Sequence, residues 1–345
     1  MLYKEPHQEK TPGFFLRLTR NCSEYTKDFW MRNGSKHEED FPLAYALLVH
    51  DSIERVSRLL RAVYRPWNIY CVHVDHKAPS IFHDAITAIT RCLPNVVTAS
   101  KYEWVVYDGF SRLQAEINCF KDILESKVKW KYAMNLAGHD FPLMDNNHIT
   151  QVLKNMQGYN VIRSVLPQDQ SIRDRYSFVH ERILLGNHEK ISRTSHLKPS
   201  PPGNVSVRHG SEHNIFSRSF ISYVLHAPFA QSLLHWFRDT QLPVQHFWAT
   251  LQAQKATPGG SSRQQWPDLG WVSKCNSNGT SSIDTKARQS GNRMNKDRCV
   301  VSVADLKWLT RQRSMFVSKL DLSYDHVAYS CLETLVLGNT QNNKT

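Results

Sequence analysis

The stretches LAYALLVH (43–50) and NIYCVHVD (68–75) are two apolar runs of strand length, and they decide the fold class. Between residues 53 and 63, apolar side chains recur at three- and four-residue spacing, which is the pattern of an amphipathic helix. Arg65-Pro66 ends that helix, because proline disfavours helical backbone in the residue before it. Strand, helix and strand in this order predict two parallel strands joined by a crossover.

The same alternation continues along the chain. It predicts a helix, a strand, a helix and a strand at 80–92, 96–99, 109–126 and 132–143. The predicted class is therefore α/β, with a central, mostly parallel sheet flanked by helices. Ligands of such sheets bind at the carboxyl ends of the strands, where His50, Asp51 and Asp75 lie.

No internal repeat or clean linker divides the chain, so one domain over 41–335 is predicted. Residues 1–40 are polar and mixed, which predicts an irregular lead-in, and 336–345 read as a polar tail. Ser, Gly, Pro, Asn and basic residues are abundant in 190–210 and 254–297, which predicts two long loops.

The charge balance predicts an anionic ligand. The chain has 345 residues, 41% of them hydrophobic, a formal net charge of +12 and a pI of about 9.4. This composition suits a folded domain with an anion-attracting surface or cleft. Nucleic acid is not expected, because no helix-turn-helix, zinc-finger or RNA-recognition pattern is present.

Cysteines and glycosylation sequons favour the secretory pathway. The seven cysteines form no CxxC pair, so disulfides are favoured over a metal site. The odd number means that one thiol is free or its partner is missing. The N-terminal residues lack the apolar core of a signal peptide. Five Asn-x-Ser/Thr sequons lie in polar stretches: Asn21, Asn33, Asn204, Asn278 and Asn343.

Seven sequence blocks, in order, resemble those of the core 2/I-branching N-acetylglucosaminyltransferases. They are FPLAYALLVH, RLLRAVYRPWNIYCVHVDHK, EWVVYDGFSRLQAEINCFKDIL, KWKYAMNLAGHDFPL, HGSEHNIFSRSFISYVL, PVQHFWATL and CVVSVADLKWLTRQRSMFVSKLD. The resemblance covers roughly residues 20–335 and weakens across 165–205 and 254–297. It implies a GT-A-type fold that transfers GlcNAc from UDP-GlcNAc to a C6 hydroxyl, with inversion and without a metal.

The residues expected to bind the UDP-sugar donor agree with a reaction that needs no metal. Metal-dependent GT-A enzymes hold a divalent cation with a DxD pair, because a hard cation needs several oxygen ligands, whereas HVDHK offers a lone Asp75. No metal or other cofactor is expected. Fixed cations would instead balance the charge on departing UDP. The resemblance assigns this role to Lys296, or a neighbour such as Arg298, and to Lys319. His50 and Asp75, at the ends of the first two predicted strands, are also predicted to contact the donor.

The position of the catalytic base departs from the family pattern. An inverting transfer needs a group that takes the acceptor proton, usually a carboxylate, and the family places a glutamate where this chain has Gln245. Losing that base costs on the order of 10²–10⁴ in rate. Three interpretations stay open: a slow or inactive relative, His246 as the base, or a change at one codon. If 245–250 is helical, His246 points about 100° away from Gln245.

Acceptor contacts are predicted at Arg173, Arg175 and Trp266. The two arginines resemble a basic acceptor-binding segment, and an exposed charge pair is the alternative. Trp266 offers an apolar ring face to a sugar, with Trp271 as rival and core packing as the alternative for both. Tyr107, Asp108, Arg112 and Asp140 are predicted to shape the cleft floor, or to serve packing and capping.

The resemblance also implies three disulfides: Cys22–Cys92, Cys71–Cys119 and Cys275–Cys299. It leaves Cys331, whose family partner lies in an upstream segment outside this sequence. The implied location is the Golgi lumen, as part of a type II membrane protein whose anchor is not in this sequence, or secretion after cleavage. A homodimer is left open.

The predicted function is a branching β-1,6-N-acetylglucosaminyltransferase, slow or inactive because of Gln245, with a UDP-sugar donor and an O-glycan acceptor. Two alternatives remain. A xylosyltransferase shares related sequence blocks, and a donor screen separates it. A non-catalytic protein that binds glycans or UDP-sugars is favoured by Gln245, and UDP binding without turnover would identify it.

Overall fold

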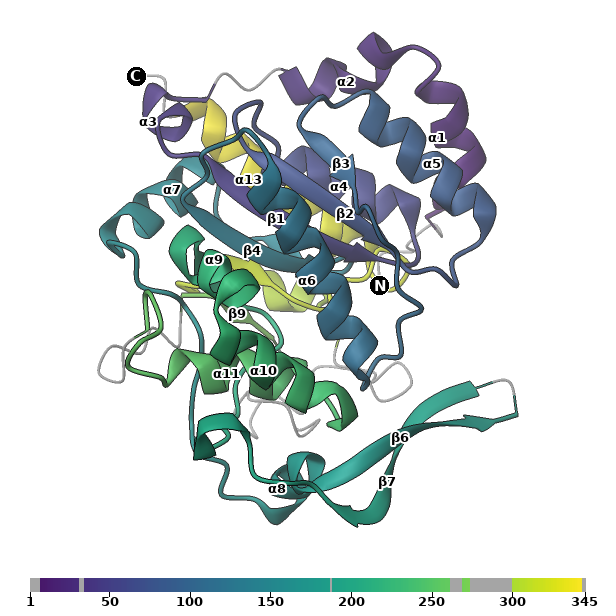
Figure 1. Ribbon diagram of the computed structural model, residues 1–345. Coiled ribbons are helices and arrows are strands. Elements are labelled where there is room, and N and C mark those ends of the chain that lie inside the picture. The colour runs from purple at the N-terminus through teal and green to yellow at the C-terminus, as the bar shows by residue number, and fades with distance from the viewer. Residues whose placement is uncertain (1–6, 31–33, 187, 261–268, 274–299, 343–345) are drawn as a thin grey trace.

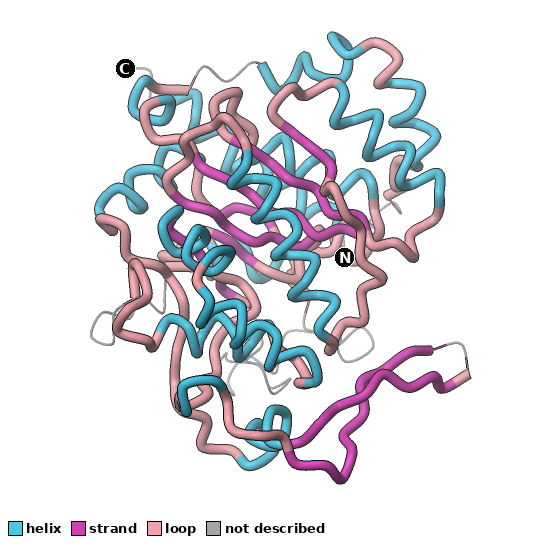
Figure 2. The backbone as a smooth tube through the Cα atoms, viewed as in Figure 1, coloured by secondary structure: helices cyan, strands magenta, loops and turns pink. Residues whose placement is uncertain are grey.

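The computed structural model describes residues 7–30, 34–186, 188–260, 269–273 and 300–342. A five-stranded sheet with the order β3-β2-β1-β4-β8 crosses the middle of the molecule, between two layers of helices (Figure 1; Figure 2). The strands are β1 (Leu43–Val49), β2 (Ile69–Val74), β3 (Val96–Thr98), β4 (Tyr132–Ala137) and β8 (Ile215–Ser217). The first four are parallel and β8 pairs with β4 in the antiparallel sense. The predicted α/β class is therefore confirmed.

Both faces of the sheet are buried, which explains why β1 is a continuous apolar run. Side chains alternate between the faces of a strand. Leu43, Tyr45 and Leu47 join one apolar cluster, which includes α4 (Ile53–Val63) and α5 (Ser80–Arg91). Ala44 and Ala46 join the other cluster, with α6 (Phe110–Glu125) and α9 (Arg218–His226). The sheet therefore packs against helices on both of its faces.

The remaining helices and strands surround this core. The other helices are α1 (Pro12–Leu18), α2 (Cys22–Trp30), α3 (Lys36–Glu39), α7 (Asn146–Asn155), α8 (Gln170–Ser177), α10 (Pro228–Trp236), α11 (Val244–Gln252), α12 (Leu306–Leu309) and α13 (His326–Asn342). The short 3-10 helices are η1 (Pro202–Asn204), η2 (Phe237–Asp239) and η4 (Val303–Asp305). The other strands are β5 (Phe141–Pro142), β6 (Phe178–Leu185), β7 (His188–Leu197), β9 (Trp271–Val272) and β10 (Phe316–Val317).

The prediction of irregular structure for residues 1–40 is wrong. This segment contains α1, α2 and α3, and α1 packs beside α5. Phe15, Tyr25 and Phe29 are buried in the core, so a few aromatic side chains anchor short helices in a segment that is otherwise rich in polar residues. The predicted polar tail at 336–345 is wrong in its first part, because α13 continues to Asn342 and Val336 is buried.

The two predicted long loops also need correction. Residues 188–197 form β7, which pairs with β6 in an exposed antiparallel hairpin that projects from the domain (Figure 1). Its backbone ladder, with Gly186 at φ +60 beside the turn, holds the two strands together although their side chains are mostly polar. Within 254–297, β9 pairs with β10, which also pairs with β5. The predicted strand 132–143 is split between β4 and β5.

Two predicted disulfides are confirmed, Cys22–Cys92 and Cys71–Cys119. The third pair, Cys275–Cys299, lies outside the described residues. Within the described ranges, no helix combines the length and the apolar character needed to cross a bilayer.

Candidate active site

A cavity of about 1100 Å³ opens at the carboxyl ends of β1, β2 and β4. Three of the predicted donor residues, His50, Asp75 and Lys319, line it together. His50 and Asp75 follow directly after β1 and β2, so the parallel register of these strands brings the two side chains to the same edge. Lys319 arrives from a distant part of the sequence, two residues after β10.

Asp75 is fixed by backbone groups. Its Oδ1 accepts hydrogen bonds from the amides of Lys77 at 3.0 Å and Val105 at 3.3 Å. The Lys77 ammonium lies 3.7 Å from Oδ2 and 5.9 Å from the centre of the Trp104 ring. The carboxylate therefore keeps one orientation, with a cation beside it.

Lys319 adopts left-handed backbone, with φ +65, which is uncommon for a residue other than glycine. Its side chain is exposed at the cavity wall. Among the described residues, no carboxylate forms an ion pair with its ammonium, so the charge is available to an anionic ligand. Lys296 and Arg298 lie outside the described residues.

Gln245 lies in the first turn of α11, as the predicted helix over 245–250 requires. Its Nε2 donates to Glu212 Oε1 at 2.9 Å, and its Oε1 accepts from an Arg175 guanidinium nitrogen at 2.9 Å. Glu212 also forms an ion pair with Arg112 at 2.7 Å. Glu212 and Arg112 both line the cavity, so the predicted base position adjoins the donor residues through Glu212.

His246 does not serve as a substitute base in this geometry. It is fully buried, and its Nδ1 lies 3.0 Å from the carbonyl oxygen of Arg208. Burial lowers the pKa of His246 to about 3. The imidazole is also absent from the cavity lining, which confirms the expectation that it points away from Gln245.

Two carboxyl groups near Gln245 have opposite pKa shifts. Burial raises the pKa of Glu116 to about 7, against the effect of Arg112 and of hydrogen bonds from Asn135 and Trp248. Burial also acts to raise the pKa of Glu212, but the Arg112 guanidinium outweighs it, with help from His213 and Gln245, and the pKa falls to about 2. At neutral pH Glu212 is therefore a carboxylate, while Glu116 is close to its titration midpoint.

The structure separates the two predicted acceptor arginines. Arg175 contacts Gln245, whereas Arg173 bonds to the carbonyl oxygens of Pro167 and Gln168 and to the side chain of Gln170. Of the two arginines, only Arg175 therefore contacts the predicted base position. Trp266 lies outside the described residues.

The rival aromatic residue, Trp271, lies beside the cavity. Its ring stacks on His213 with centroids 5.3 Å apart and on Phe316 at 4.9 Å. His213 lines the cavity, so Trp271 supports one wall through it.

Of the residues predicted to shape the cleft floor, two line the cavity and two do not. Tyr107 and Arg112 line the cavity. Asp140 is buried beneath it, where its Oδ2 accepts from the Ala137 amide at 2.7 Å and lies 3.4 Å from His213. Asp108 instead holds the segment before α11, since its carbonyl oxygen accepts from the Leu242 amide at 2.7 Å.

Sequence reasoning missed Glu212. It stands in the HGSEH segment, 33 residues before Gln245, and no spacing rule connects the two. The one feature of the sequence that could have indicated Glu212 is that it is a carboxylate within a block, HGSEHNIFSRSFISYVL, that resembles the family.

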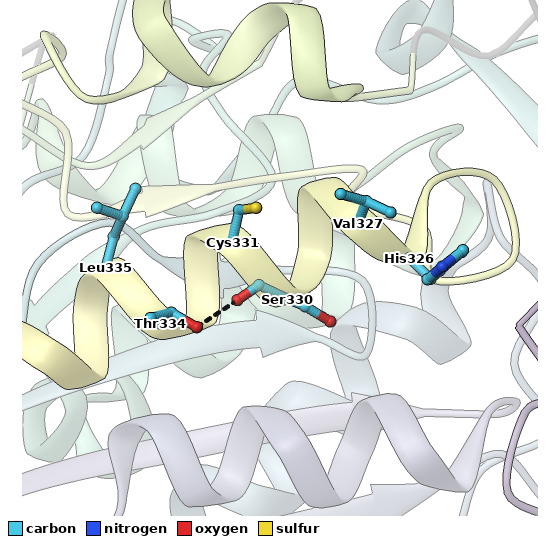
Figure 3. A pocket seen from close by; sticks show the side chains of 6 residues that line it. All are labelled: His326, Val327, Ser330, Cys331, Thr334 and Leu335. Atoms are coloured by element: carbon cyan, nitrogen blue, oxygen red, sulfur yellow. Dashed lines mark hydrogen bonds between the residues drawn. The ribbon is translucent and has the colours of Figure 1, made fainter. Parts of the chain in front are cut away.

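A second hollow, of about 500 Å³, lies along α13 (Figure 3), and its lining shares no residue with that of the cavity. It is lined by His326, Val327, Ser330, Cys331, Thr334 and Leu335. Cys331 is exposed and forms no disulfide in the described part of the chain. Its pairing with an upstream cysteine stays a prediction.

Two of the five sequon asparagines, Asn21 and Asn204, are exposed. The other three, Asn33, Asn278 and Asn343, lie outside the described residues.

Most of the chain is similar in sequence to known glycosyltransferases. Residues 43–310 match the family model of the Core-2/I-Branching enzyme. The chain is 39% identical over 326 residues to the N-acetyllactosaminide beta-1,6-N-acetylglucosaminyl-transferase of Mus musculus, covering 93% of this chain and 80% of that protein. It is 36% identical to the Beta-1,3-galactosyl-O-glycosyl-glycoprotein beta-1,6-N-acetylglucosaminyltransferase 3 of Homo sapiens, covering 96% of this chain and 76% of that protein.

Likeness to solved structures is weaker. The mannosyltransferase Ktr4p of S. cerevisiae is 14% identical with a TM-score of 0.33, covering 72% of this chain and 80% of that one, which is too low to carry a conclusion. The family model and the two sequence relatives, by contrast, extend over most of the chain. The chain therefore belongs to the Core-2/I-Branching enzyme family.

Proposed function

We propose that this chain transfers GlcNAc from UDP-GlcNAc to the C6 hydroxyl of a GalNAc or Gal residue on an O-glycan, with inversion. The observation that carries the proposal is the arrangement of His50, Asp75 and Lys319 around one cavity that adjoins Gln245. The two relatives described above are named as β-1,6-N-acetylglucosaminyltransferases, which supports the same donor and linkage.

The roles follow from the chemistry of these side chains. Asp75, held by two backbone amides, and His50 offer hydrogen-bonding groups to the uridine end of the donor. Lys319 places a fixed cation where the diphosphate would lie, and it stabilises the negative charge on the departing UDP.

We further propose that the reaction needs no metal. In HVDHK, a DxD motif would place its second carboxylate two residues after Asp75, and this chain has Lys77 there. The Lys77 ammonium lies 3.7 Å from Asp75, so the position supplies positive charge rather than a ligand for a cation.

The proposed compartment is the Golgi lumen, with this chain as the luminal part of a type II membrane protein. Disulfides form and persist in oxidising compartments, and the chain contains Cys22–Cys92 and Cys71–Cys119. The exposed sequons at Asn21 and Asn204 suit the same compartment.

A donor and acceptor screen tests the proposal. UDP release is measured with UDP-GlcNAc and with UDP-xylose, each with Galβ1-3GalNAc or N-acetyllactosamine as acceptor, with and without EDTA. We expect turnover with UDP-GlcNAc, no effect of EDTA, and a β-1,6 linkage in the product. Turnover with UDP-xylose alone would establish a xylosyltransferase instead, and loss of turnover in EDTA would refute metal independence.

The second candidate function is non-catalytic binding of UDP-sugars or glycans. Gln245 favours it, because an amide has no useful basicity at the position where the family has its base. Saturable UDP binding by calorimetry, without turnover of any donor in the screen, would establish it.

A further inference from the structure

The carboxylate of Glu212 lies within one hydrogen bond of Gln245, the position at which the family resemblance predicts the base. Its Oε1 accepts from Gln245 Nε2 at 2.9 Å. The Gln245 amide is held at its other end by Arg175, so its nitrogen faces Glu212. The negative charge missing at position 245 is thus present one contact away.

Glu212 is held in place by the backbone around it. The Gly210 amide donates to the carbonyl oxygen of Gln245 at 2.8 Å, and a side chain at position 210 would meet the carbonyl oxygen of Arg163 at 2.1 Å. Asn135 donates to the carbonyl oxygen of Glu212 at 2.7 Å and accepts from the Asn214 amide at 2.7 Å. Glycine and these two bonds fix the loop 210–214 against α11 and β4.

Glu212 also keeps the capacity to accept another proton donor. An ionised carboxylate has about four acceptor positions. The described partners are Gln245 and, at 3.4 Å, the Tyr107 hydroxyl on Oε1, and Arg112 on Oε2. The side chain is 20% exposed and faces the cavity. A sugar hydroxyl entering from the cavity can therefore reach it.

The other carboxylates that line the cavity are engaged elsewhere. Asp51 and Asp321 both face Arg55, and Glu189 contacts Arg182 and Trp104. Asp75 is held at the donor end. Glu116 is buried, with its carboxyl oxygens bonded to Asn135 and Trp248. Among the described lining residues, Glu212 alone combines contact with Gln245 and access to the cavity.

We propose that Glu212 is the general base of this chain and that Gln245 orients it. This inference rests on the glycosyl transfer proposed above. The acceptor C6 hydroxyl gives its proton to a Glu212 oxygen while the hydroxyl oxygen forms a bond to C1 of GlcNAc. The bond from C1 to the diphosphate oxygen breaks, and its electron pair leaves with UDP. The protonated Glu212 then returns its proton to water.

The test compares the wild type with Glu212→Gln and with the double variant E212Q/Q245E, which moves the carboxylate to the predicted base position. Calorimetric UDP binding and the melting temperature are measured for each. Glu39→Gln, an exposed change on α3, is the control for the loss of one negative charge. We expect Glu212→Gln to lower kcat about 10²-fold or more, with UDP binding unchanged.

The double variant distinguishes loss of a catalytic base from loss of a carboxylate that only stabilises the fold. Glu212→Gln leaves Arg112 without its carboxylate partner, which alone can destabilise the fold, whereas E212Q/Q245E keeps the charge count of the cluster. We expect the double variant to recover kcat to within about tenfold of the wild type. In chemical rescue, formate is expected to accelerate Glu212→Ala and to leave the wild type unchanged, an effect that restored folding alone does not produce.

The outcomes separate the two proposals. If the wild type turns over and Glu212→Gln retains its kcat, Glu212 is not the base although the transferase function stands. If only E212Q/Q245E turns over, the donor and acceptor sites are intact and position 245 alone provides the base, which overturns the inference. If none turns over although all bind UDP, the transferase function fails and the inference fails with it.

Discussion

The two halves of the cavity are built in different ways. The donor half, where we propose that UDP-GlcNAc binds, is positioned by the sheet, since His50 and Asp75 directly follow parallel strands and Asp75 is held by backbone amides. The base half, where we propose that the acceptor proton is taken, depends on contacts between side chains of separate elements, Arg175 on α8, Gln245 on α11 and Glu212 on a loop. A single substitution in the base half can therefore change these side-chain contacts while leaving the donor half intact.

The largest expected effect is a loss of kcat on removing a cation from the donor half. Lys319→Ala should lower kcat by about 10²–10³, because the cation that stabilises the departing UDP is lost. Initial rates at saturating UDP-GlcNAc measure it. Lys307→Ala, an exposed lysine on α12, is the matched control and should change kcat less than about twofold. An unchanged kcat in Lys319→Ala would remove Lys319 from the donor half.

The next effect is a pH dependence of stability in the base half. Burial raises the pKa of Glu116 from 4.5 to about 7 in the folded protein. Its contribution to stability is therefore fully present below about pH 4.5 and is lost as the pH rises through 7. This loss amounts to about 3 kcal/mol. Glu116→Gln removes the titrating group and should lower the pH dependence of the unfolding free energy by that amount.

Chemical denaturation at pH 5 and pH 8 measures this effect. The difference in unfolding free energy between the two pH values should be larger in the wild type than in Glu116→Gln. Equal pH slopes for the two proteins would show that Glu116 does not titrate in this range.

The two arginines of α8 provide a matched pair of substitutions, one that contacts Gln245 and one that does not. Arg175→Ala removes the guanidinium that fixes the Gln245 amide, and we expect kcat/KM for the acceptor to fall about tenfold, the cost of one charged hydrogen bond. Arg173→Ala is the matched change in the same helix and should have little effect, since the described hydrogen bonds of its side chain are to residues 167–170. Equal effects of the two substitutions would contradict the separation seen here.

The smallest effect concerns the β6–β7 hairpin. Trp104 Nε1 donates to Glu189 Oε2 at 2.7 Å, and both residues line the cavity. Trp104→Phe removes this bond and keeps an aromatic ring. We expect the KM for UDP-GlcNAc to rise about threefold, because one neutral donor to a surface carboxylate is lost. A KM identical to that of the wild type would show that the hairpin has no part in donor binding.

The donor half was predictable from local pattern. LAYALLVH and NIYCVHVD are apolar runs that each end in a polar residue, His50 and Asp75. Because the two strands are parallel neighbours in the sheet, these two residues come to lie at the same edge. Family resemblance supplied Lys319, which no local pattern indicates. The disulfide Cys71–Cys119 likewise came from resemblance, and it connects β2 to α6.

The base half and the outer elements were not predictable in the same way. The contact between Glu212 and Gln245 depends on how a loop and α11 meet, which one sequence does not specify. Most of β7 falls within the loop predicted over 190–210, because its side chains are mostly polar and the strand is held by backbone pairing with β6. Helices α1 and α2 are not predicted because residues 1–40 are polar on average, whereas burial of a few side chains such as Phe15 and Tyr25 stabilises these helices.

The measurement that tests the central claim most directly is the ratio of kcat for Gln245→Glu to kcat for the wild type at pH 7. If Glu212 already provides the base, a second carboxylate at 2.9 Å adds repulsion and retains a proton between the two groups, so the ratio should stay below about ten. A rise of a hundredfold or more would show that position 245 is an unfilled base site and that Glu212 does not replace it.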